Sequence, residues 1–205
     1  MAGLAFAHSM ERRSNGNVIA TMQAADRDYG GHGGLAEFDD LGKVVRSASA
    51  APAESVATLL RPYSLAIIEK KDRIVTASSR MGLPPWDTRA DDFEHEHTGF
   101  HIQLWRLADL SLLETFPLPA AEGYDSHLSP YEPRVLDDGE TVLVMTSRCG
   151  LFKVGPVDQR FSAELVYRID GRGCAVPLRV GRFWIQGVRG TSWCWTSAIP
   201  RDPQK

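Results

Sequence analysis

The sequence predicts an all-β protein: a β-propeller of four-stranded antiparallel blades, of which about three and a half are present. Short runs rich in Val, Ile, Leu and Thr alternate with turns rich in Gly, Asn and Asp, at intervals too short for helices of ordinary length. Four such runs within about 40 residues make one blade-sized sheet. The same plan recurs along the chain, and a recurring supersecondary unit is typical of a radial repeat.

The third unit has the clearest strand pattern. The Asp-Asp-Gly sequence at 137–139 predicts a tight turn between an extended segment at 131–135 and a strand at 141–146. Third and fourth strands are expected at 150–154 and 162–169.

The units upstream follow the same plan. In the first unit, turns at 15–16 and 39–42 help to separate strands expected at 6–12, 18–22, 34–38 and 44–48. In the second, turns at 71–72 and 108–109 accompany strands expected at 62–69, 74–79, 101–107 and 112–118. A fourth unit begins with 174–177, turns at Gly181 and gives a second strand at 183–188, where the pattern ends.

The expected organisation is one partial propeller over residues 1–188, followed by an irregular tail at 189–205. The units span about 3–51, 58–119, 129–171 and 173–188. A frayed terminus would explain the tail. The alternative is a reading-frame shift, because codons for Leu-Val-Leu-Asp-Ile read one base out of phase can encode the Trp-Cys-Trp-Thr-Ser found at 193–197.

The composition excludes several classes of protein. With 43% hydrophobic and 24% charged residues, the chain can bury a core. A net charge of −3 without a long run of Lys or Arg argues against nucleic acid and anionic membrane partners. No apolar run approaches the roughly 20 residues of a membrane span, and the first residues do not form a secretory signal, so we expect a soluble, cytoplasmic protein. Three cysteines without a C-x-x-C spacing do not indicate a disulfide framework.

Short segments of the units carry a family signature. They are Ala-His-Ser at 7–9, Asn-Gly-Asn-Val at 15–18, Arg-Pro-Tyr-Ser-Leu at 61–65, Ile-Gln-Leu-Trp-Arg-Leu at 102–107, Glu-Pro-Arg-Val-Leu at 132–136 and Cys-Gly-Leu-Phe at 149–152. These segments resemble bacterial relatives of the selenium-binding protein and methanethiol oxidase family. The resemblance covers residues 3 to about 188 and implies about half of a seven-bladed, WD/YVTN-like ring.

The same resemblance implies a metal-dependent oxidoreductase of methanethiol oxidase type. This chain lacks the paired-cysteine motif and the His-Asp-Trp segment of full members of the family, so its own enzymatic activity stays open.

The first strand of each propeller blade lines the central channel, and this geometry selects candidate site residues. Near the start of successive first strands lie His8, Tyr63 with Ser64, Glu132 and Cys174, while Cys149 lies in a loop that opens toward the same face. An imidazole, a carboxylate and thiols suit Cu or Zn, so we expect a metal site at His8, Glu132, Cys149 and Cys174. Tyr63, Ser64 and His127 are expected at the channel rim.

Each of these residues could instead have a purely structural role. A lone buried cysteine is usually a small hydrophobe, and Glu132 could pair with Arg134. In the long loop at 80–99, His95 and His97 with flanking carboxylates form a secondary metal candidate, although such a run is more often a solvated acidic loop.

Three functions therefore remain open from the sequence: a metal-dependent propeller, a non-catalytic propeller that binds a small molecule or protein at its channel face, and an inactive truncated fragment. In each case another chain could supply the missing blades. The glycine-rich segment at 29–34 does not open a helix, so it is interpreted as a flexible connection rather than a phosphate loop. Trp105, Phe152 and Trp184 are expected to pack between blades.

Overall fold

The computed structural model describes residues 3–54, 56, 59–78, 99–120, 129–146, 150–155 and 162–168, and the backbone of 178–180 and 183–185. The predicted all-β class is confirmed: this part of the chain forms three four-stranded sheets and one two-stranded sheet. It also contains a single turn of 3-10 helix, η1, at Glu69–Lys71. Within these ranges no helix is long and apolar enough to cross a bilayer.

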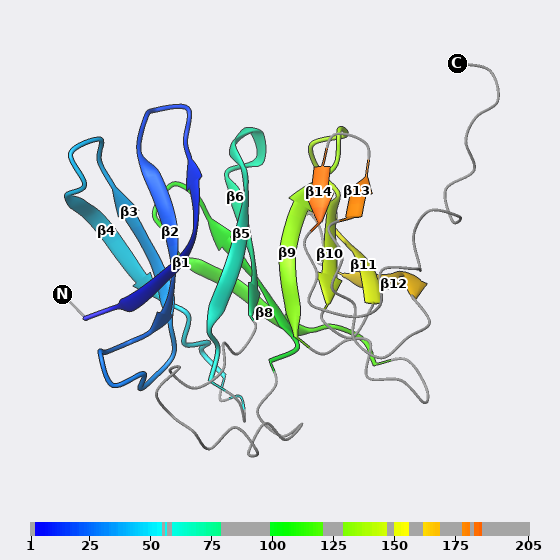
Figure 1. The fold of residues 1–205 in the computed structure, drawn as a ribbon, viewed down its shortest axis with the longest axis horizontal. Coiled ribbons are helices and arrows are strands. Elements are labelled where there is room, and N and C mark those ends of the chain that lie inside the picture. Colours follow the sequence, from blue (N-terminus) through cyan, green and yellow to red (C-terminus); the bar gives the residue numbers. More distant parts are fainter. Residues whose placement is uncertain are drawn as a thin grey trace.

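Each four-stranded sheet is an antiparallel meander in which consecutive strands are neighbours (Figure 1). The first sheet contains β1 (Ala5–Arg12), β2 (Val18–Ala24), β3 (Gly34–Phe38) and β4 (Val44–Ser49). The second contains β5 (Pro62–Ile68), β6 (Arg73–Ser78), β7 (His101–Arg106) and β8 (Leu112–Pro117). The third contains β9 (Pro130–Val135), β10 (Val142–Thr146), β11 (Gly150–Val154) and β12 (Ala163–Arg168).

A hairpin of β13 (Leu178–Val180) and β14 (Phe183–Ile185) follows the third sheet. The strand expected at 174–177 lies outside the described residues. In the first three sheets, the strand ends lie within two residues of the sequence-based expectation, which is the usual uncertainty of such boundaries.

Local turn chemistry explains where the strands reverse. Gly16, Gly42 and Gly139 have φ values of 92°, 77° and 72°, a backbone region that strains other residues. The Asp138 carboxylate accepts hydrogen bonds from the backbone N–H groups of Glu140 and Thr141 at 2.9 and 2.8 Å. These turns form from residues within a few positions of one another, so the hairpins are locally encoded.

The three sheets pack face to face in chain order, as blades do (Figure 1). Between the first and second, Trp105 and Ile74 pack with Ile19 and Leu35 in one buried cluster. Between the second and third, a second cluster includes Val75, Leu104, Val144 and Phe152. The predicted packing role is confirmed for Trp105 and Phe152, both 0% exposed, while the Trp184 side chain lies outside the described part.

The glycine-rich connection before β3 is tightly packed, so the expectation of a flexible link was wrong at Gly33. Its N–H donates to the carbonyl of Leu60 and its carbonyl accepts from the N–H of Ala50, both at 2.8 Å. A Cβ at Gly33 would lie 2.1 Å from the carbonyl oxygen of Met22. The glycine is required here because two backbone segments approach each other closely.

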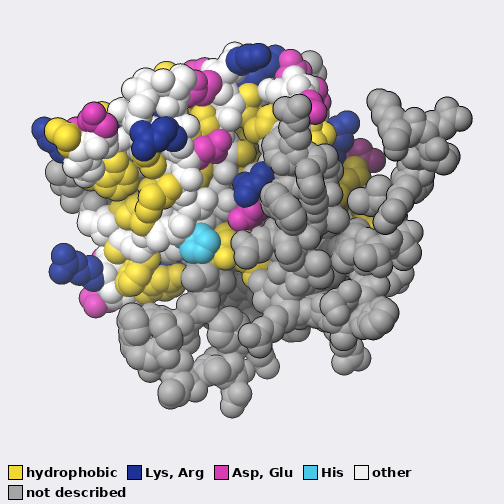
Figure 2. All heavy atoms as spheres, turned by 45° about the horizontal axis from the view of Figure 1, so that its top comes forward, with side chains coloured by type: hydrophobic (Ala, Val, Ile, Leu, Met, Phe, Trp, Pro, Cys, Tyr) yellow, Lys and Arg dark blue, Asp and Glu magenta, His cyan; other side chains and the backbone are white. Residues whose placement is uncertain are grey.

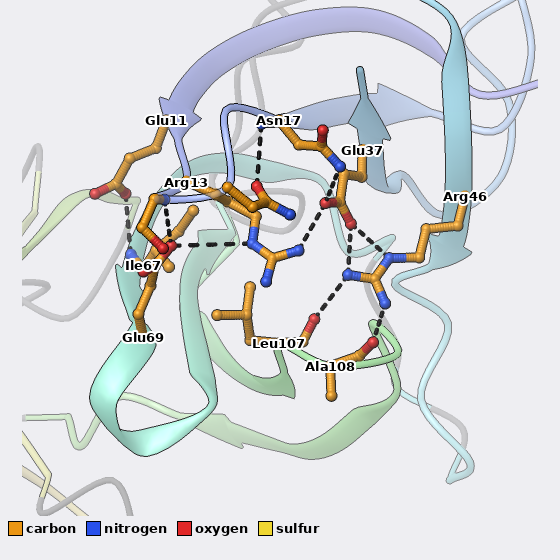
Figure 3. A network of polar contacts seen from close by, with 11 residues as sticks. Glu11, Arg13, Asn17, Glu37, Arg46, Ile67, Glu69, Leu107 and Ala108 are labelled. Atoms are coloured by element: carbon orange, nitrogen blue, oxygen red, sulfur yellow. Dashed lines mark hydrogen bonds and ion pairs between the residues drawn. The ribbon is translucent and has the colours of Figure 1, made fainter. Parts of the chain in front are cut away.

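A buried carboxylate lies at the contact between the first two blades (Figure 3). Glu37 is 1% exposed and accepts hydrogen bonds from Arg13 at 2.7 Å, Asn17 at 2.8 Å and Arg46 at 2.5 Å. Burial by itself would raise the pKa of Glu37, but these hydrogen bonds and the Arg46 charge together lower it below the ordinary value. Glu37 is therefore a satisfied structural anion.

The same network joins the two blades. Arg46 donates to the carbonyl oxygens of Leu107, at 2.9 Å, and Ala108, which belong to the second blade. In return, Glu69 of the second blade accepts a hydrogen bond from the backbone N–H of Ser14 at 2.7 Å. These bonds fix the first blade against the second, and thereby the relative position of β1 and β5.

Candidate functional site

The strands that carry the candidate residues lie side by side. β1, β5 and β9 are each the first, edge strand of their sheet, and β5 contacts both β1 and β9. Figure 1 shows the three strands in this order across the molecule. Side chains at equivalent positions of successive first strands can therefore meet, as the propeller interpretation requires.

Three aromatic rings from these strands form a continuous row. The rings of His8 on β1 and Tyr63 on β5 have centroids 3.8 Å apart and are tilted by 38°. Tyr63 in turn meets Tyr131 of β9 edge to face, with centroids 4.8 Å apart. The row connects three blades at one level, and its first member, His8, is exposed.

One hydrogen bond fixes the orientation of the His8 ring. Its Nδ1 lies 2.8 Å from the carbonyl oxygen of Tyr63, and the hydroxyl of Thr21 donates to the same oxygen at 3.0 Å. Because a carbonyl can only accept, Nδ1 carries the proton in this contact. The lone pair of His8 is then on Nε2.

The two tyrosines are neutral hydrogen-bonding groups. Burial raises the pKa of Tyr63 to about 12, with smaller contributions from its electrostatic interactions with Tyr131 and Glu132. Burial also raises the pKa of Tyr131. Because both phenols keep their protons at neutral pH, they can donate to a bound anion but do not supply a phenolate ligand.

Glu132 lies beside this row and already has a partner. Arg134, two residues further along β9, donates through Nη2 to Oε2 of Glu132. The ion pair considered as an alternative from the sequence is therefore present. The Glu132 side chain is 20% exposed, so its carboxylate still reaches the surface.

Ser64 lies next to the row but is 1% exposed. Its hydroxyl oxygen is 3.4 Å from that of Ser9, across the contact between β5 and β1. The side chain therefore contributes to the junction of the two blades.

The remaining candidates, Cys149, Cys174, His95, His97 and His127, lie outside the described residues. Among the residues that are described, no group of three or more His, Cys, Asp or Glu side chains could hold a metal ion. The pairing of His8 and Glu132 with the two cysteines stays a prediction.

Sequence reasoning missed a groove along the same three strands. It is lined by residues 9–11 of β1, 65–67 of β5 and 133–136 of β9 and the turn after it, and has a volume of about 520 Å³. Glu11 and Arg134 are its charged lining residues. Glu11 lies three positions after His8 on β1, so its place on a channel strand was the available signal.

Two further histidines, His32 and His101, have contacts that are separate from the aromatic row. Nδ1 of His32 accepts a hydrogen bond from the N–H of Leu60 at 3.0 Å, and burial, with the nearby Arg61 charge, lowers the pKa of His32. His101 is 7% exposed and stacks on Phe100 with ring centroids 4.3 Å apart, and burial lowers its pKa. Of the described histidines, His8 is the one that belongs to the row of aromatic rings.

The surface carries mixed charge. Figure 2 shows acidic, basic and apolar side chains interspersed over the coloured part of the face that it views, with no continuous patch of one sign.

Antiparallel four-stranded meanders that pack face to face, with their first strands adjacent, define the β-propeller class. In keeping with this, a solved structure described as a hypothetical selenium-binding protein from Sulfolobus tokodaii superposes with a TM-score of 0.61 at 15% identity. That match covers 82% of this chain and 36% of the other, so this chain spans little more than a third of the Sulfolobus protein. At this identity the likeness establishes the propeller fold.

The β-propeller domain of Cps50 (Swd1) from Myceliophteria thermophila also matches, with a TM-score of 0.47 and 11% identity over 80% of this chain and 39% of that one. No family model matches the sequence. No curated protein is significantly similar to it.

Proposed function

We propose that this chain is part of a metal-binding propeller of the selenium-binding protein type, with His8 as the anchoring ligand at the channel mouth. One observation carries the proposal: Nδ1 of the exposed His8 bonds the Tyr63 carbonyl at 2.8 Å. Metal-binding histidines usually hold their second nitrogen in this way, which fixes the tautomer and orients the ligating nitrogen. Nε2 of His8 would bind the metal.

Glu132 is the second proposed ligand. It directly follows Tyr131, the last ring of the aromatic row that holds His8, on β9, and its charge contributes to the raised pKa of Tyr63. Its carboxylate fits a borderline metal such as Cu or Zn, but Arg134 engages Oε2 and competes for it. Metal binding would therefore require the Glu132–Arg134 pair to weaken or to leave one oxygen to the metal.

Cys149 and Cys174 complete the proposed ligand set from the sequence. A set of one imidazole, one carboxylate and two thiolates would favour Cu or Zn. The oxidoreductase activity of methanethiol oxidase type, implied by the family resemblance, belongs to the same proposal. In that activity a bound metal would supply the redox or Lewis acid chemistry, while this chain's residues would orient it.

The test is metal analysis of the purified whole chain by mass spectrometry after loading with Cu or Zn. We expect stoichiometric metal in the wild type and its loss in the double variant His8→Ala/Glu132→Ala. Arg134→Gln should instead bind more tightly, because it frees the carboxylate and removes a repelling cation.

The double variant His95→Ala/His97→Ala is the control for the secondary site. Metal that stays in the first double variant and disappears in this control would assign the site to the 80–99 loop and refute the proposal. Stoichiometric binding unchanged in both would refute both sites.

A further inference from the structure

We propose that the groove between β1, β5 and β9 binds an organic cation, a primary ammonium group on an aliphatic chain, with Glu11 as its counter-ion. The groove lies beside the proposed metal ligands but uses different side chains, so the inference does not depend on the metal site. Its volume of about 520 Å³ is within the usual range for small-molecule pockets.

The first observation is the state of Glu11. It is half-buried, and its Oε2 accepts a hydrogen bond from the N–H of Ile67 at 2.9 Å. No ion pair of the described residues includes Glu11, although Arg13, two residues further along the chain, pairs with Glu37. In Figure 3 the Glu11 carboxylate points away from the guanidinium groups of Arg13 and Arg46. Glu11 is thus a partly buried carboxylate whose hydrogen-bond donor among the described residues is one neutral backbone N–H group.

The second observation is that the other charged lining residue already has a counter-ion. Arg134 donates to Glu132, so its charge is balanced within β9. Arg134 acts on Glu11 only from a distance, since the two form no pair within 4.0 Å. Glu69 also repels the Glu11 charge, more weakly than Arg134 attracts it, and has Arg13 at 4.0 Å as its own partner. Of the two charged residues that line the groove, Glu11 is thus the one without an ion-pair partner, which favours a cation as the ligand.

The electrostatics of Glu11 agree with this geometry. Burial raises the pKa of its carboxyl group and the Glu69 charge adds to the effect, while the Ile67 N–H and Arg134 oppose them. Burial raises a carboxyl pKa when its charge lacks full compensation. A bound ammonium would supply that compensation and donate to Oε1.

The walls of the groove define the rest of the ligand. Leu65, Ala66 and Ile67 of β5 line the groove, opposite Val135. These residues carry no charge, and the charged lining residue Arg134 is already paired with Glu132, so an aliphatic chain fits better than a second ionised end. Met10 also lines the groove and is 64% exposed, so the entrance is open to solvent.

The ammonium group could come from a free alkylamine or from a lysine side chain of a protein, and the experiment separates them. Isothermal titration calorimetry of the whole chain at pH 8 would use n-hexylammonium, a blocked lysine peptide and hexanoate. We expect one of the two ammonium probes to bind and hexanoate not to bind. The tighter ammonium probe identifies the source.

Glu11→Gln is the decisive variant. Its amide oxygen can still accept from Ile67, so folding is retained, but the charge is lost, and we expect about tenfold weaker ammonium binding. Glu114→Gln, the same change at an exposed carboxylate of β8, is the matched control and should bind as the wild type does. Met10→Lys adds a positive charge at an exposed lining position and should also weaken binding.

Thermal denaturation of each variant would verify folding. Binding of hexanoate in place of the ammonium probes would overturn the proposal and assign the groove to Arg134. Absence of binding by both ammonium probes, or binding as strong in Glu11→Gln and Met10→Lys as in the wild type, would also overturn it. Loss of metal in His8→Ala with ammonium binding intact would separate this site from the proposed metal site.

Discussion

Glu37→Gln tests whether one buried carboxylate holds the first blade against the second. Glu37 is 1% exposed and compensates two cations, with Arg13 at 2.7 Å and Arg46 at 2.5 Å. Glutamine keeps the shape of the side chain, but it lacks the charge and turns an amide NH₂ group toward a guanidinium donor. The substitution therefore leaves two arginines in the contact without their shared anion.

The expected loss follows from the exposure of these arginines. Removing one partner of a buried ion pair costs about 3–5 kcal/mol. The Arg13 and Arg46 side chains are 18% and 26% exposed, so water partly solvates them, and Arg46 keeps the carbonyls of Leu107 and Ala108. We therefore expect a decrease of about 3 kcal/mol in the free energy of unfolding, at the lower end of that range.

Urea denaturation followed by tryptophan fluorescence would measure this decrease, because Trp105 is buried in the cluster between the same two blades. Glu114→Gln, at an exposed position on β8, is the control and should change stability by less than about 0.5 kcal/mol. A loss below about 1 kcal/mol for Glu37→Gln, close to that of the control, would refute the assigned role of the network.

Three further outcomes are expected. The pKa of Glu37 is lowered in the folded state, so its contribution to the free energy of unfolding is present above the unfolded carboxyl pKa of about 4.3 and is lost as the pH falls toward the folded value. Urea titrations at pH 7 and pH 3.5 should therefore show that the stability difference between wild type and Glu37→Gln shrinks in acid. Gly34→Ala would place a Cβ 2.1 Å from a carbonyl oxygen of β4 and should cost a few kcal/mol in thermal denaturation, whereas Gly42→Ala, in open space at φ 77°, should cost only about 1–2 kcal/mol. Trp105→Ala removes a fully buried side chain and its hydrogen bond to Thr76, so circular dichroism melts should report a loss of about 3–5 kcal/mol, and a loss under about 1 kcal/mol would contradict the packing role.

The strands and hairpins were predictable because their signals are local. The turn at 137–139 and the alternating residues on either side of it predict β9 and β10 without reference to any distant residue. The recurrence of this plan then predicted blades, and adjacent first strands followed from the propeller class. The expectation of a flexible link at Gly33 failed because its tight packing depends on Leu60 and Met22, which belong to other segments.

The candidate site was predictable only at the level of position. Equivalent places on first strands suggested that His8, Tyr63 and Glu132 would be near one another. The ring contacts between His8, Tyr63 and Tyr131 agree with this expected closeness of the first strands. The partner of each side chain was not readable. Whether Glu132 is open to a metal or paired with Arg134 depends on rotamers and neighbours, so both possibilities stayed open until the side chains were placed.

The sequence alone determined the strand periodicity, the turns and their repetition, since these arise from residues close together in the chain. Only the tertiary structure decided that Glu37 has two cations while Glu11 has none within ion-pair distance, although both are glutamates on strands of one blade. The reason is physical: the state of a charge depends on burial and on partners from other segments, and residue type does not encode these.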